Sequence, residues 1–135
     1  MTSLTEFLFP APARRRPLDI IGWWEKRRLA YNVFVGSAGL LSLGIMSVIS
    51  LILPMGGQGF FIPWQPVVAF GVMANIFYLL GPAAELLIHR LFRGEILPTG
   101  PALYRMGLTF SVGLALFPAL LMMVILVIQL VMTVF

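Results

Sequence analysis

Two long uncharged stretches dominate the pattern of polar and apolar positions along the chain. No charged residue lies between Arg28 and Glu85, and none follows Arg105. A bilayer hydrocarbon core about 30 Å thick needs about 20 apolar residues of helix to cross it. We therefore predict three membrane-spanning helices, at 29–53, from 62 or 66 to 80 or 88, and at 103–135. The intervening segment 54–66 is rich in glycine and proline, and this composition predicts a loop.

The composition agrees with this all-α membrane interpretation. Of the 135 residues, 60% are hydrophobic and 10% are charged, whereas soluble domains average about 45–50% and about 25%. A chain of this size has no room for a separate soluble catalytic domain beside three spans. Cysteine is absent, which excludes disulfides, thiolate metal sites and cysteine nucleophiles.

Basic residues indicate how the spans are oriented. Lysine and arginine near span ends are retained on the cytoplasmic side. All nine basic residues precede the first predicted span or lie around the connection between the second and third: Arg14, Arg15, Arg16, Lys26, Arg27, Arg28, Arg90, Arg93 and Arg105. We expect a multi-pass protein of the bacterial inner membrane, with a cytoplasmic N-terminus and a periplasmic C-terminus. The net charge of +4 is then a topology signal, and we expect no nucleic-acid partner.

The residues before the first span combine apolar, aromatic and basic side chains. Pro17 and Asp19 are typical of a helix start. Tryptophan beside basic residues suits the lipid headgroup layer. We predict an interfacial anchor lying along the cytoplasmic surface, formed by Trp23, Trp24, Lys26, Arg27 and Arg28. This divides the chain into a tail and interfacial segment at 1–28 and a three-helix membrane domain at 29–135.

Small residues recur at every fourth position in the third span. This spacing places them on one ridge of the helix, where another backbone can approach closely. In the second span the amide of Asn75 needs a partner in an apolar environment. The helix-packing residues that we predict are Gly36, Gly39, Asn75, Gly107, Ser111, Ala115 and Ala119. They suit packing within the chain and packing against another protein equally. Pro118 predicts a kink in the third helix, and Gly81-Pro82 a break or bend in the second.

One cluster has side chains capable of chemistry. Glu85 and His89 are four residues apart and share a helix face. A metal site needs three or four ligands, and the chain has no second histidine. We therefore expect an ion pair between them, with no metal, no cofactor and no catalytic residue. No acidic residue lies in mid-span, where ion-coupled transporters carry them.

Two sequence blocks point to a family. WWEKRRLAYN at 23–32 and ANIFYLLGPAAEL at 74–86 resemble signature blocks of a group of small bacterial integral membrane proteins. That resemblance implies a multi-pass membrane protein and brings no activity with it. We expect a non-catalytic accessory subunit that stabilises a bacterial membrane protein complex, photosynthetic or respiratory, with other membrane subunits and lipids as partners. The alternative is a small homo-oligomeric channel or transporter component.

Overall fold

The computed structural model describes residues 16–53, 64–93 and 99–135. Within these residues the chain is all-helical, with α2 at Pro17–Ile52, α3 at Trp64–Leu91 and α4 at Gly100–Val134. Each helix is long and apolar enough to cross a membrane, which confirms the prediction of three candidate spans. Most of the predicted loop at 54–66 lies outside the described residues.

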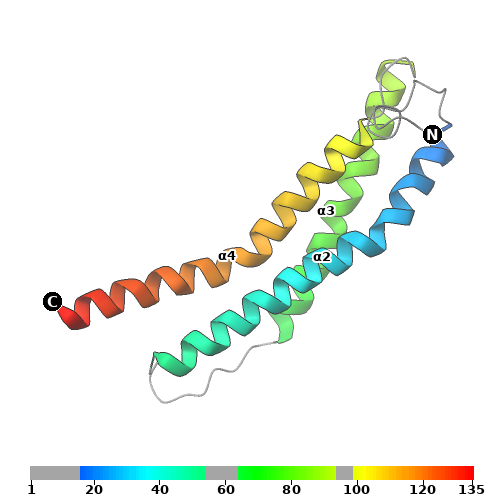
Figure 1. Ribbon diagram of the computed structural model, residues 1–135. Coiled ribbons are helices and arrows are strands. Elements are labelled where there is room, and N and C mark those ends of the chain that lie inside the picture. Colours follow the sequence, from blue (N-terminus) through cyan, green and yellow to red (C-terminus); the bar gives the residue numbers. More distant parts are fainter. Residues whose placement is uncertain (1–15, 54–63, 94–98) are drawn as a thin grey trace, which may run out of the picture.

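The three helices form an open bundle (Figure 1). α2 and α4 start at the same end and run in the same direction, and α3 runs in the opposite direction. At the converging end, the start of α2, the end of α3 and the start of α4 come together. At the opposite, splayed end the helices spread apart. The most extensive contact joins α2 and α4, which are not adjacent in the sequence.

α2 starts where Pro17 and Asp19 predicted a helix start. Pro17 occupies the first helical turn, and the backbone N–H of Arg16 donates to the Asp19 carboxylate over 3.0 Å. From there α2 continues unbroken to Ile52. Residues 17–28 therefore belong to the same helix as the predicted first span, and no helix end marks the predicted boundary between 28 and 29. The interfacial position of residues 17–28 stays a prediction.

The two internal prolines have different consequences. Pro82 lies inside α3, which continues without interruption to Leu91. Of the predicted break or bend at Gly81-Pro82, the break is therefore wrong, and the bend stays a prediction. Pro118 lies inside α4, and Figure 1 shows this helix bending near its middle. Because proline lacks an N–H and crowds the preceding turn, it accounts for the predicted kink.

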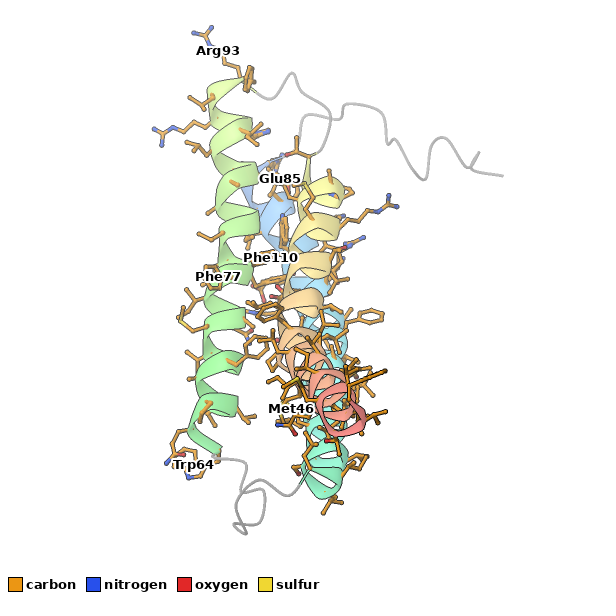
Figure 2. The ribbon with its side chains drawn as sticks, turned by 90° about the vertical axis from the view of Figure 1, so that its left-hand side faces the viewer. Met46, Trp64, Phe77, Glu85, Arg93 and Phe110 are labelled. Atoms are coloured by element: carbon orange, nitrogen blue, oxygen red, sulfur yellow. The ribbon has the colours of Figure 1, made fainter. Side chains whose placement is uncertain are left out.

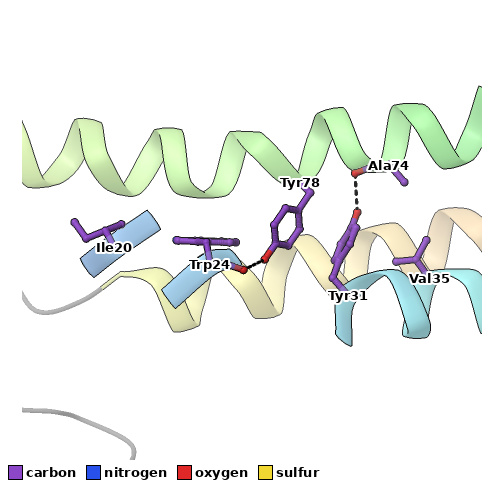
Figure 3. Packing of buried hydrophobic residues seen from close by; sticks show 6 residues of the cluster. All are labelled: Ile20, Trp24, Tyr31, Val35, Ala74 and Tyr78. Carbon is purple, nitrogen blue, oxygen red and sulfur yellow. Dashed lines mark hydrogen bonds between the residues drawn. The ribbon is translucent and has the colours of Figure 1, made fainter. Parts of the chain in front are cut away.

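The core lies toward the converging end. Its members, contributed by α2 and α3 and shown in Figure 3, are Ile20, Trp24, Tyr31, Val35, Ala74 and Tyr78. Successive members on each helix are spaced by four or seven residues, which places them on one face of that helix. Small residues of α2 and α4, including Ser42, Ala115 and Ala119, are buried beyond this core. Residues 64–73 of α3 and 120–135 of α4 include no buried side chain, and Figure 2 shows apolar side chains projecting outward there.

Candidate functional site

A tryptophan and a glutamate meet at the centre of the converging end. Trp24 of α2 is 3% exposed and Glu85 of α3 is 4% exposed. The indole Nε1–H of Trp24 donates to Oε2 of Glu85 over 2.6 Å. A buried carboxylate without partners is unfavourable, so this hydrogen bond stabilises Glu85 while it ties α2 to α3.

Two glycines provide the space for this pair. A Cβ placed on Gly81 of α3 would overlap the Trp24 ring. A Cβ on Gly100, at the start of α4, would stand 2.5 Å from Oε2 of Glu85. Figure 2 shows Glu85 beside this start of α4. Because these two glycines have no side chain, α2, α3 and α4 can all lie close to the Trp24–Glu85 pair.

Two tyrosines extend the hydrogen-bonded cluster along the bundle (Figure 3). The Tyr78 hydroxyl donates to the backbone carbonyl of Trp24, and its ring lies 4.7 Å from the Tyr31 ring. The Tyr31 hydroxyl donates to the carbonyl of Ala74 over 3.1 Å and lies 2.7 Å from Oγ of Ser111. Trp24, Tyr31, Tyr78, Glu85 and Ser111, here called the polar lock, therefore link all three helices.

Further aromatic side chains surround the polar lock on the α4 side. Tyr104 packs edge-to-face against both Trp23 and Trp24. The Arg27 guanidinium lies 3.7 Å from the centre of the Trp23 ring, and it donates to the Trp23 carbonyl. These contacts hold basic and aromatic groups together at the end of the bundle.

The predicted anchor residues have different environments. Lys26 is exposed, and Arg27 and Arg28 are half-buried. Trp23 is half-buried, and Trp24 is buried between helices. Trp24 thus differs from the interfacial side chain that we expected, because Gly81 opens a space for it inside the protein. The anchor role of the remaining residues stays a prediction.

The predicted ridge on α4 lies mostly inside the bundle. Ser111, Ala115 and Ala119 are buried. Gly107 is exposed, with open space where a side chain would be. Gly36 and Gly39 of α2 likewise face open space. The buried face of α2 instead consists of Ile20, Trp24, Tyr31, Val35, Ala38, Ser42 and Ile49.

Asn75 has the interhelical partner that an amide needs in an apolar environment. Its Nδ2 donates to Oδ1 of Asn32 over 3.0 Å. The same nitrogen donates to the Gly71 carbonyl one turn back in α3. This pair gives α2 and α3 a further polar contact, on a more exposed side of the bundle.

Glu85 and His89 do not form the expected ion pair in the described part of the chain. The Glu85 carboxylate accepts the Trp24 indole N–H instead. His89 is half-buried one turn further along α3. Among the described residues, no three histidine, aspartate or glutamate side chains gather as a metal site would require.

We did not predict the roles of Tyr31, Tyr78, Tyr104 and Gly100 from the sequence, and from Gly81 we predicted only a break or bend. One available signal was the seven-residue interval from Trp24 to Tyr31, repeated from Tyr78 to Glu85, because residues seven apart share a helix face.

Comparisons with protein families, curated proteins and solved structures found no match to this chain. The resemblance of the two sequence blocks therefore stays a prediction. The polar lock itself is suited to holding helices in register.

Proposed function

We propose that the protein is a non-catalytic accessory subunit that packs against other helices of a bacterial inner-membrane complex. One observation carries the proposal: most glycines of the described helices have open space where a side chain would be. Those of α2 and α4 are Gly22, Gly36, Gly39, Gly44, Gly107 and Gly113. The packing of the described helices against one another does not use them.

Outward glycines favour contact with another helix. In a bilayer, apolar side chains gain little by leaving lipid for a protein surface, and close approach of backbones supplies much of the attraction between helices. Glycine permits that approach but lowers helix stability by about 1 kcal/mol relative to alanine. The polar lock holds the three helices in one arrangement, and this keeps the outward glycine faces in fixed positions for a partner.

The proposal includes an orientation with the converging end in the cytoplasm. The basic residues of the described helices lie at the start of α2, the end of α3 and the start of α4, and cytoplasmic retention of such charges supports this direction. Because the chain has no cysteine, single cysteines introduced at Arg93 and Phe135 can be labelled selectively. We expect Phe135→Cys to be labelled from the periplasm and Arg93→Cys to be labelled only after lysis. The reverse pattern contradicts the orientation.

The proposed function is tested by gentle purification of the tagged protein from its native membrane. The accompanying proteins are then identified by mass, and absorption spectra are recorded. The spectra are informative because photosynthetic and respiratory complexes carry coloured cofactors. We expect other membrane subunits in constant proportion to this chain. Recovery of a homo-oligomer with no other protein contradicts the proposal and favours a channel or transporter component.

Matched variants show which surface binds the partner. Gly36→Leu and Gly107→Leu add bulk to the outward glycine faces, and we expect them to reduce partner recovery while the purified chain keeps its stability. Ala69→Leu is the control, because Ala69 is exposed on α3 and lies outside these faces. Equal recovery with all three variants contradicts a glycine-mediated interface.

A further inference from the structure

An open groove of about 510 Å³ lies between α2 and α3, outside the polar lock. One face of α3 lines it through residues spaced by three or four positions, including Val68, Gly71, Val72, Asn75 and Leu79. Arg28 of α2 contributes the charged part of the lining. The groove therefore has aliphatic walls along α3 and a cation toward the converging end.

Hydrogen-bond donors are left over beside this groove. Arg28 is 36% exposed, and its Nη1 pairs with Glu25 over 3.2 Å. A guanidinium has five N–H donors, so most of its donors stay available. One turn further along α2, Asn32 accepts from Asn75, while its own Nδ2 donates to no group in the described part of the protein.

We propose that this groove binds one anionic glycerophospholipid. Its phosphate contacts Arg28, its ester carbonyls accept from the Asn32 amide, and an acyl chain lies over Val68 and Val72. Arg28 and Asn32 are separated by about 6 Å along the helix axis, from four residues at about 1.5 Å each. That spacing matches the short glycerol link between the phosphate and the ester groups of such a lipid.

The chemistry of the groove distinguishes a lipid from a protein helix as its occupant. Phosphate and ester oxygens only accept hydrogen bonds, and the free groups of Arg28 and Asn32 only donate them. An apolar helix laid over the groove would bury a guanidinium and an amide without partners, which is unfavourable. A zwitterionic lipid carries its own cation beside the phosphate, so the additional charge of Arg28 favours an anionic headgroup.

The test counts lipids retained by the full-length chain. The purified protein is reconstituted in nanodiscs of equal parts phosphatidylglycerol and phosphatidylcholine, released into mild detergent and analysed by native mass spectrometry. We expect one retained phosphatidylglycerol per chain. Arg28→Gln lowers retention about five-fold, as expected for one basic contact with an anionic lipid. Gly71→Leu fills the groove without changing the charge, because a Cβ on Gly71 meets open space, and it removes the lipid.

Matched controls separate this site from general attraction to the membrane surface. Lys26→Gln makes the same charge change at an exposed position, and Gly113→Leu makes the same size change on α4. Both variants keep the lipid. Glu25→Gln breaks the Arg28 ion pair and keeps or raises retention. Equal losses for Lys26→Gln and Arg28→Gln, retention by Gly71→Leu, or equal retention of phosphatidylcholine each overturn the proposal. Because the purified chain is tested alone, the result is independent of the proposed host complex.

Discussion

At the converging end of the bundle, hydrogen bonds and ring contacts join all three helices, whereas at the splayed end apolar side chains face outward. The converging end buries Trp24, Tyr31, Tyr78 and Glu85. At the splayed end, residues 64–73 of α3 and 120–135 of α4 include no buried side chain, although Ile49 and Leu53 of α2 are buried. The more polar of the two regions is thus the more closely packed one.

This difference follows from the physics of lipid as a solvent. Moving an apolar side chain from lipid to protein brings little gain, so apolar residues alone do not specify one arrangement of spanning helices. Hydrogen bonds between buried groups and close fits at glycine do specify one. A few residues at one end can therefore define the bundle and leave the other end open to lipid or to another protein.

The largest effect is expected where the fit is closest. Gly81→Ala places a Cβ where it overlaps the Trp24 ring. We expect this substitution to lower the free energy of unfolding by about 3 kcal/mol, which is the upper end of the usual range for overpacking a protein interior. Denaturant titration of the purified protein measures the change. Gly113→Ala is the control, because open space surrounds Gly113. A similar loss in both variants would show that the close fit at Gly81 has no special role.

The next effect is expected at the small-residue face of α4. Ala115 is 5% exposed, so Ala115→Leu forces α4 away from its neighbours and is expected to lower the free energy of unfolding by about 2 kcal/mol. Ala102→Leu makes the same change at an exposed position of α4 and should leave the free energy nearly unchanged. If Ala115→Leu is equally harmless, the ridge is not a close contact.

A double-mutant cycle measures the hydrogen bond between Trp24 and Glu85. Trp24→Phe removes the donor and Glu85→Leu removes the acceptor. We expect a coupling energy of about 1.5–3 kcal/mol, as for hydrogen bonds that involve a charged group. The double variant should therefore be more stable than the sum of the single losses predicts. Additive losses would mean that the two residues stabilise the bundle independently.

The smallest effect is expected at the splayed end. It is measured by comparing a valine-to-alanine substitution there with the same substitution in the core. Val127→Ala in α4 changes a side chain that is 58% exposed and should alter the free energy of unfolding by less than about 0.5 kcal/mol. Val35→Ala, in the core, should cost about 1–2 kcal/mol. Equal effects in the purified chain would remove the distinction between the two ends.

The sequence predicted the features that depend on local pattern. Length and hydropathy identified three candidate spans, four-residue spacing found Ser111, Ala115 and Ala119, and Pro118 located the bend in α4. Each of these properties is visible within one helix. None of them requires knowledge of which other helix lies opposite.

Features that depend on a partner helix were not predictable in the same way. Trp24 beside basic residues is typical of an interfacial anchor, and only the facing Gly81 makes its burial feasible. Gly36 and Gly39 have the small size of packing residues, but size does not fix which face of α2 turns inward. Large side chains such as Tyr31 and Val35 determine that face, because they need the space between helices.

The extensive contact between α2 and α4 has a consequence for biosynthesis. α3 separates these helices in the sequence, so the ribosome completes α2 and α3 before α4 exists. During that interval Tyr31 lacks Ser111, and the buried face of α2 lacks its main neighbour. Helices that emerge in this order must wait in the membrane, or beside the insertion machinery, until the third one arrives. The native bundle is thus completed only after translation of the last helix, however early the first two enter the bilayer.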